Sequence, residues 1–129
     1  MLQDSKAFFS FSVDDLNRAK EFYGDVLQLA VKMTPEGLSM ELAGGGKGFL
    51  YPKPNHQPAT FTVLNFQVAD VDAAVAELKK RGVKFEHYDM PELKTDENGI
   101  ARGNGPTIAW FKDPAGNILS VIEMEGRLS

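Results

Sequence analysis

The stretch FSFSVDDL, residues 9–16, alternates apolar and polar side chains and then reaches two aspartates. Alternation with a period of two predicts a strand that has one apolar face and one polar face. Asp14 and Asp15 are good N-cap residues, so a helix is expected to begin directly after this strand. The apolar residues that recur after them at helical spacing are Leu16, Ala19, Phe22, Tyr23, Val26 and Leu27.

The same pattern returns later in the chain. LNFQV, residues 64–68, alternates in the same way, Asp70 stands at a cap position, and an apolar helical stripe runs on to Gly82. The two copies align without gaps at an offset of 55 residues. The matched pairs are Phe11 with Phe66, Val13 with Val68, Asp15 with Asp70 and Ala19 with Ala74. We therefore expect a duplicated module.

Short β-rich runs separated by turn residues follow each predicted helix. In the first copy they are residues 29–33, 38–42 and 49–51. In the second copy they are residues 83–88, a short piece near Ile100, then 107–111 and 118–122, the last two joined by the turn DPAGN. Each copy thus reads βαβββ, with a first module over 6–51, a linker over 52–59 and a second module over 60–125. Because one such sheet has a bare face, the two modules are expected to pair around a shared cavity.

Composition excludes several classes of protein. The 129 residues are 43% hydrophobic and 25% charged, as in one soluble globular domain, and no apolar run is long enough to cross a membrane. A net charge of −4 has the wrong sign for a protein that binds nucleic acid through its phosphates. The absence of cysteine excludes disulfides, thiolate zinc sites and thiol nucleophiles. The segment MLQDSK does not resemble a secretory signal, so a soluble, cytoplasmic protein is expected.

The two copies and the closing turn resemble the glyoxalase, bleomycin-resistance and extradiol-dioxygenase superfamily, also called vicinal oxygen chelate proteins. The segments that carry the resemblance are FSVDDL (11–16), FQVADV (66–71) and DPAGNI (113–118). The resemblance implies an α+β fold in which two βαβββ modules form an open eight-stranded half-barrel around a small-molecule cavity. It also implies a homodimer. It does not imply one reaction, because members isomerise, cleave aromatic rings, open epoxides or only sequester drugs.

The metal site of this family can be compared position by position. The metal-dependent members hold a divalent ion through His, Gln or Glu on the first and last strands of each module. Carried over to this chain, three of the four positions fall on Phe8, Val63 and Ser120, and the fourth lies within residues 48–51, where only Tyr51 offers an oxygen. Apolar side chains cannot replace the ligands of a divalent cation. We therefore expect no metal and no cofactor.

The strand alternation predicts which side chains line the cavity. If Phe9, Phe11 and Val13 pack under the helix, their neighbours point to the opposite face. Aromatic rings there could stack on a planar ligand, and Arg102 in the long loop 91–106 could pair with an anionic group. The candidate ligand-binding residues are Phe8, Ser10, Ser12, Tyr51, Asn65, Gln67, Arg102, Trp110 and Ser120. The alternative is that the polar residues simply face solvent and that Trp110 completes the core.

Two histidines are the remaining candidates for acid–base chemistry. His87 lies between Glu86 and Asp89, and a neighbouring carboxylate could make it a general base. An exposed structural histidine explains His87 at least as well, and His56, in the Pro-rich linker, carries less weight.

Three functions stay open on this evidence. The leading hypothesis is a metal-free protein that binds a small, partly planar organic molecule between the modules, with no nucleic acid or membrane partner. The second is an enzyme of the same fold, a lyase, isomerase or dioxygenase-like protein, that uses His87, Tyr51 or Glu41 in place of a metal. The third is a structural or regulatory dimer whose cavity is vestigial.

Overall fold

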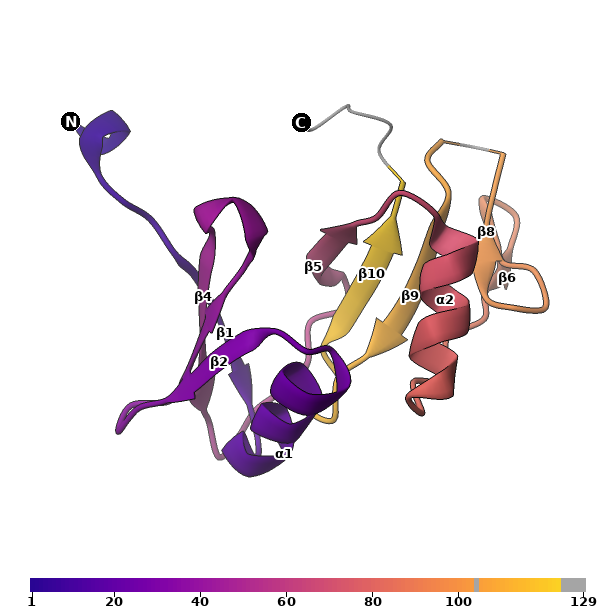
Figure 1. Cartoon of the computed structure of the whole chain (residues 1–129). Helices are drawn as coiled ribbons and strands as arrows, with labels where there is room; N and C mark the ends of the chain where they lie inside the picture. The colour runs from indigo at the N-terminus through magenta and orange to yellow at the C-terminus, as the bar shows by residue number, and fades with distance from the viewer. Residues whose placement is uncertain (104, 124–129) are drawn as a thin grey trace. The chain divides into compact units, whose positions relative to one another are not determined.

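The computed structural model describes residues 1–103 and 105–123. Asn104 of the long loop and residues 124–125 at the end of the predicted second module lie outside this part of the chain. The chain divides into two compact units, Met1–Pro58 and Ala59–Ser129. Each unit combines a four-stranded sheet with a helix, and each is described by itself (Figure 1).

The first unit contains the first predicted module. Its elements are η1 (Leu2–Asp4), β1 (Phe9–Val13), α1 (Leu16–Lys20), the π-helix η2 (Glu21–Val26), β2 (Ala30–Met33), β3 (Leu38–Glu41), η3 (Ala43–Gly45) and β4 (Lys47–Pro52). The strand order is β1-β4-β3-β2. β1 runs parallel to β4, and the other neighbours are antiparallel.

The second unit repeats this arrangement. Its elements are β5 (Thr62–Gln67), α2 (Val71–Lys80), β6 (Asp89–Met90), β7 (Leu93–Lys94), β8 (Ile100–Ala101), β9 (Ile108–Lys112) and β10 (Ile118–Ile122). The strand order is β5-β10-β9-β8, with β5 parallel to β10, and β6 pairs with β7 in a small separate hairpin. The predicted fold class, two βαβββ modules with open mixed sheets, is confirmed.

The two helices begin in the same way. Asp15 and Asp70 adopt nearly identical extended conformations, with φ −141° and ψ 106° in the first and φ −146° and ψ 106° in the second. Asp15 Oδ1 accepts hydrogen bonds from the amides of Asn17 and Arg18, and Asp70 Oδ1 accepts one from Ala73. Both predicted N-caps are therefore confirmed, and they satisfy amides that a helix end leaves without a partner.

Each sheet buries one face under its helix, as the alternation predicts. In the first unit the buried side chains are Val13, Ala19, Tyr23, Leu38, Met40 and Leu50. The ring of Phe9 lies directly over Gly48, where an added Cβ would stand 2.5 Å from the ring. A larger residue at position 48 would therefore force the tip of the Phe9 ring to move. In the second unit the buried side chains include Val71, Val75, Phe85, Ile100, Ala109, Phe111, Leu119 and Val121.

The structure differs from the sequence expectation over residues 83–88, where the predicted strand is wrong. Only Phe85 pairs, in an isolated antiparallel bridge with Phe111. The amide of Glu86 still donates to the carbonyl of Trp110, but the amide of Tyr88 donates to the Thr95 hydroxyl. Because the backbone turns to this side-chain partner, the ladder stops after one bridge.

The loop predicted over residues 91–106 contains more order than expected. It includes β7 and β8, joined by a turn in which Asp96 Oδ1 accepts hydrogen bonds of 2.9 Å from the amides of Asn98 and Ile100. Gly99 sits in this turn with φ +84°, a conformation that favours glycine.

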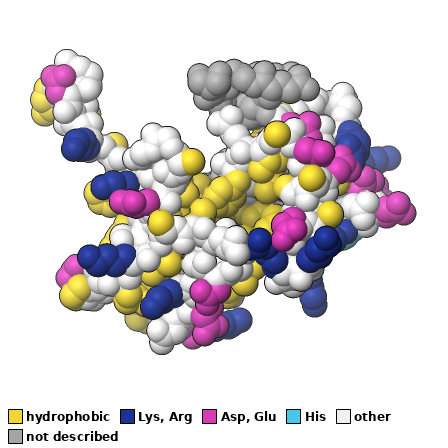
Figure 2. All heavy atoms as spheres, viewed as in Figure 1, with side chains coloured by type: hydrophobic (Ala, Val, Ile, Leu, Met, Phe, Trp, Pro, Cys, Tyr) yellow, Lys and Arg dark blue, Asp and Glu magenta, His cyan; other side chains and the backbone are white. Residues whose placement is uncertain are grey.

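The surface carries charge of both signs. Figure 2 shows Lys and Arg side chains interspersed with Asp and Glu side chains on the visible face of each unit. Among the residues that the structure describes, no helix combines the length and the apolar character needed to cross a bilayer.

Candidate functional site

Three predicted site residues lie side by side on the second sheet. β10 runs between β5 and β9, and its Ser120 stands opposite both Asn65 and Trp110. Directly paired residues share a face of a sheet, so the three side chains form a row across the face that is turned away from Leu119 and Val121. Ser120 is fully buried, and its hydroxyl donates a 2.5 Å hydrogen bond to Asn65 Oδ1. This bond satisfies the buried hydroxyl and orients the Asn65 amide.

Trp110 is held in place by contacts on two sides. Its indole Nε1 donates a 3.1 Å hydrogen bond to the Thr62 hydroxyl. The ring of Tyr88 meets the indole edge to face, with centroids 5.4 Å apart. Burial, and then the charge of Glu86, raise the pKa of the Tyr88 phenol, so it stays protonated at neutral pH. The indole is only partly buried, so a ligand can reach it without first ordering it.

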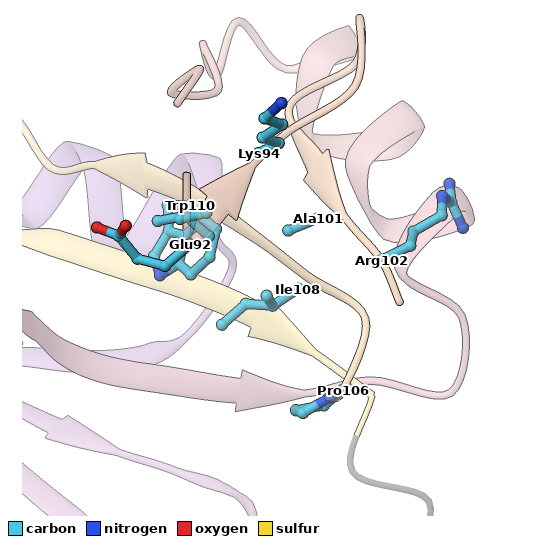
Figure 3. Close-up of a pocket in the computed structure, with 8 residues that line it drawn as sticks. Glu92, Lys94, Ala101, Arg102, Pro106, Ile108 and Trp110 are labelled. Carbon is cyan, nitrogen blue, oxygen red and sulfur yellow. The ribbon is translucent and has the colours of Figure 1, made fainter. Parts of the chain in front are cut away.

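A hollow of about 220 Å³ opens beside Trp110 (Figure 3). Ile108 and Trp110 of β9 form part of its apolar lining. The β6-β7 hairpin adds one acidic and one basic side chain, Glu92 and Lys94. The lining residues are Glu92, Leu93, Lys94, Ala101, Arg102, Pro106, Ile108 and Trp110. Cavities for drug-sized ligands usually start at about 300 Å³. This hollow therefore suits a small molecule or the flat part of a larger one.

Arg102 lines the hollow, but its guanidinium is already paired with two carboxylates. Its guanidinium binds Asp72 on α2 through two hydrogen bonds, 2.6 Å and 3.2 Å long, and its Nε lies 3.6 Å from Asp96. The hydrogen bond from Arg102 lowers the pKa of Asp72 and raises the pKa of Arg102. In Figure 3 the guanidinium points away from Trp110 and Ile108. The expected pairing with an anionic ligand would have to compete with these two carboxylates.

The other predicted residues lie elsewhere on the two sheets. Gln67 is exposed on β5, two residues beyond Asn65 and on the same face. Ser10, Ser12 and Tyr51 form a cluster of their own in the first unit, because Ser12 pairs with Tyr51 across β1 and β4. Phe8 precedes β1 and is 69% exposed.

One residue of the first unit gains importance from the structure. The hydroxyl of Ser12 lies 2.6 Å from Nδ1 of His56. Sequence reasoning gave His56 little weight, because nothing in the Pro-rich segment indicates that it folds back onto β1. His87, the favoured histidine, is exposed, and the carboxylate of its neighbour Glu86 pairs with Lys112 at 3.5 Å. Glu41 is likewise paired, with Lys47 at 3.9 Å.

Sequence reasoning also missed part of the hollow. Ile108 could have been found, because it lies two residues from Trp110 on the same strand and so on the same face. Glu92, Leu93 and Lys94 gave no local signal, since their place depends on how the β6-β7 hairpin folds.

The strand pairing indicates which residue stands at the fourth position that the resemblance implies for a metal ligand. Ser10 and Asn65 are equivalent in the repeat, and their partners on β4 and β10 are Phe49 and Ser120. The fourth position therefore falls on Phe49 and not on Tyr51. The complete set is Phe8, Phe49, Val63 and Ser120, whose single hydroxyl is bonded to Asn65. These residues do not fit a divalent cation. Over residues 1–103 and 105–123, no three His, Asp or Glu side chains group closely enough to bind a metal ion.

Comparison with known proteins identifies related folds. The family model described as Glyoxalase/Bleomycin resistance protein/Dioxygenase superfamily matches residues 7–121. A glyoxalase/bleomycin resistance protein from Streptomyces sp. CB03234 is 24% identical, with 92% of this chain and 100% of that chain covered and a TM-score of 0.62. TnmS3, an antibiotic binding protein from the same Streptomyces, is 22% identical, with coverages of 93% and 97% and a TM-score of 0.64. A glyoxalase family protein from Enterococcus faecalis is 20% identical, with coverages of 95% and 100% and a TM-score of 0.67. No curated protein sequence matches the chain.

Proposed function

The chain belongs to the glyoxalase/bleomycin resistance protein/dioxygenase superfamily, and on this premise we propose that it binds a small, partly planar organic molecule against Trp110 without the help of a metal. The observation that carries the proposal is the 220 Å³ hollow beside an indole whose position is already fixed by Thr62 and Tyr88. An aromatic ring held ready in a partly apolar hollow favours stacking with a flat ligand.

Polar side chains at the hollow can orient a bound ligand. Ser120 stands between Asn65 and Trp110 in the sheet, and its buried hydroxyl is bonded to Asn65. The polar groups at the hollow itself include Glu92 and Lys94, which offer one charge of each sign. A flat ring with a few polar substituents matches this combination better than a purely apolar molecule does. Antibiotics are reasonable probes because TnmS3, which shares the fold, is an antibiotic binding protein.

The metal-free part of the proposal rests on the chemistry of the equivalent ligand positions. Three of the four side chains there are apolar, and the hydroxyl of Ser120 already donates to Asn65. A divalent ion would lose its water at this place and gain no adequate donor in return.

The test uses the only tryptophan of the chain, Trp110, as its own reporter. Planar antibiotics and small aromatic compounds are titrated while indole fluorescence is followed, and hits are checked by calorimetry. A true ligand should change the fluorescence with a saturable curve. Replacement of Trp110 by Ala should weaken ligand binding up to about tenfold, because an aromatic pair contributes roughly 0.5–1.5 kcal/mol beyond the area it buries. Calorimetry measures this change, because the variant contains no tryptophan.

Phe61→Ala is the matched control, since Phe61 is an aromatic residue of the same unit that is 67% exposed and does not line the hollow. Binding that is equally strong in Trp110→Ala and in the parent protein would contradict the proposal. If no compound in the panel binds, the hypothesis of a vestigial cavity gains instead. The homodimeric state and cytoplasmic location expected from the sequence stay predictions, and light scattering measures the first.

A further inference from the structure

Ser12 and His56 form a polar pair that the proposed binding function does not use. They are 44 residues apart in the sequence, yet the Ser12 hydroxyl lies 2.6 Å from His56 Nδ1. Two backbone hydrogen bonds bring the histidine back to the strand. The amide of Lys53 donates to the carbonyl of Val13, and the amide of His56 donates to the carbonyl of Lys53.

The contact has the geometry of an activated nucleophile. A serine hydroxyl is a weak nucleophile by itself, and an imidazole nitrogen within hydrogen-bond reach can take its proton as it attacks. This requires the imidazole tautomer that carries its hydrogen on Nε2, so that Nδ1 accepts the hydrogen bond from Ser12 Oγ. A distance of 2.6 Å places the two groups close enough for direct proton transfer.

The pair lies on the polar face of the first sheet and not in its core. Ser12 is only partly buried, and Ser10, two residues earlier on the same face, is exposed. Tyr51, directly opposite Ser12 on β4, is 37% exposed. A small carbonyl compound can approach Ser12 from this side, and the phenol ring of Tyr51 offers it an apolar surface.

We propose that Ser12 accepts an acyl group from small activated esters, with His56 as its general base. Ser12 Oγ forms a bond to the carbonyl carbon, and the bond from that carbon to the leaving oxygen breaks. His56 takes the hydroxyl proton and passes it to the leaving alcohol or phenol. Water then attacks the acyl-serine while His56 takes its proton, the bond from the carbonyl carbon to Ser12 Oγ breaks, and His56 returns the proton to Ser12 Oγ as the carboxylic acid leaves.

This activity goes beyond ligand binding at Trp110 and uses a different unit of the chain. It also gives the enzyme hypothesis a specific pair of residues. The two proposals are separable, because a variant at Trp110 leaves Ser12 and His56 in place.

The experiment uses p-nitrophenyl acetate as the acyl donor and the full-length chain. Release of p-nitrophenolate is followed by absorbance, and the acetylated protein is digested and mapped by mass spectrometry. We expect one acetyl ester at Ser12 that hydroxylamine removes under mild conditions, which distinguishes it from acetyl-lysine. Ser12→Ala should abolish this ester. His56→Gln should slow its formation about 100-fold, the lower range of general base catalysis.

Ser39→Ala is the matched control, since Ser39 is a serine of the same sheet whose hydroxyl donates to the carbonyl of Lys32 and not to a histidine. It should react like the parent protein. The proposal is overturned if Ser12→Ala releases p-nitrophenolate as fast as the parent protein, or if His56→Gln does. His56 lies on an irregular segment, so its replacement keeps the test valid even if Ser12→Ala unfolds.

Discussion

At the scale of single residues, the turn between β9 and β10 depends on one buried carboxylate. Asp113 is 4% exposed, and its Oδ1 accepts hydrogen bonds from the amides of Ala115 and Asn117. Its Oδ2 accepts a third from the Asn117 side chain, which is also buried. The turn aligns β9 with β10 and so brings Trp110 opposite Ser120. Asp113 therefore supports both stability and the geometry of the candidate site.

Replacing Asp113 by Ala should destabilise the protein by about 1–3 kcal/mol, because buried donors are left without an acceptor. Asp113→Asn should cost less, since one side-chain oxygen remains. Urea unfolding measures both changes. Asp14→Ala is the control, because Asp14 is an exposed aspartate, and it should leave the unfolding midpoint nearly unchanged. An Asp113→Ala protein as stable as the parent would show that the turn holds without its carboxylate.

At the scale of elements, one arginine fastens the end of β8 to α2. Arg102 follows β8 and binds Asp72 in the first turn of α2, while Asp96 lies in the turn before β8. The hydrogen bond from Arg102 lowers the pKa of Asp72. Desolvation raises the pKa of Asp96, but hydrogen bonds from Ile100 and Asn98 and the charge of Arg102 outweigh it, so this pKa is also lowered.

This connection predicts a loss of stability in acid. A carboxyl whose pKa is lower in the folded than in the unfolded protein binds fewer protons when folded, so acid favours unfolding. Its stabilisation is complete above the usual value of 3.8 and disappears as the pH falls through the folded pKa. Arg102→Gln should therefore be less stable than the parent at neutral pH, and the difference should shrink below pH 3.8. Urea unfolding at low salt across this range measures it, because salt screens pairs as exposed as these.

Arg81→Gln is a suitable control. Arg81 also pairs with a carboxylate, but its partner Glu77 lies only four residues earlier in the chain, at the end of the same helix. A difference between Arg102→Gln and the parent that persists unchanged in strong acid would mean that Arg102 acts through packing and not through its charge.

The pairing between β5 and β10 contains one irregularity. The pairing of β10 with β5 shifts between Ile118 and Leu119, so Thr62 stands opposite Ile118 while Leu64 stands opposite Leu119. An extra residue of this kind changes which face a side chain occupies. Thr62 thereby reaches the indole of Trp110. No feature of the residue pattern indicates this shift, and the prediction from strict alternation did not include Thr62.

At the scale of the whole molecule, the positions that the resemblance implies for a metal are divided between the two repeated units. The two sheets have the same strand order, so the family's metal positions are equivalent pairs, Phe8 with Val63 and Phe49 with Ser120. Each pair lacks an adequate donor. The protein keeps the family's fold, and we expect that no metal binds at these positions.

Metal addition and removal should therefore leave the protein unchanged. After EDTA treatment, addition of Ni²⁺, Zn²⁺ or Mn²⁺ should not raise the midpoint of thermal unfolding, and ligand binding at Trp110 should be the same with and without EDTA. A specifically bound ion at 100 times its dissociation constant would instead stabilise the fold by about 2.7 kcal/mol. Metal analysis of the purified protein is the direct measurement, and one firmly bound equivalent per chain would contradict the prediction.

The residue pattern alone determined the first strand, the starts of both helices and the duplication. The alternation over residues 9–13 and the caps Asp15 and Asp70 act between near neighbours in the chain, so they can be recognised without a structure. That Phe8, Val63 and Ser120 stand at the positions implied for metal ligands is an interpretation of the sequence, and the absence of a metal stays a prediction.

Only the tertiary structure decided which distant residues meet. His56 reaches Ser12 because an irregular segment turns back along β1, and Trp110 meets Thr62 because the pairing of β5 with β10 shifts by one residue. The hairpin that carries Glu92 and Lys94 contributes to the hollow through its fold and not through any local pattern. Such contacts depend on turns and strand register, which many sequences satisfy in different ways, and therefore a pattern of apolar and polar residues cannot specify them.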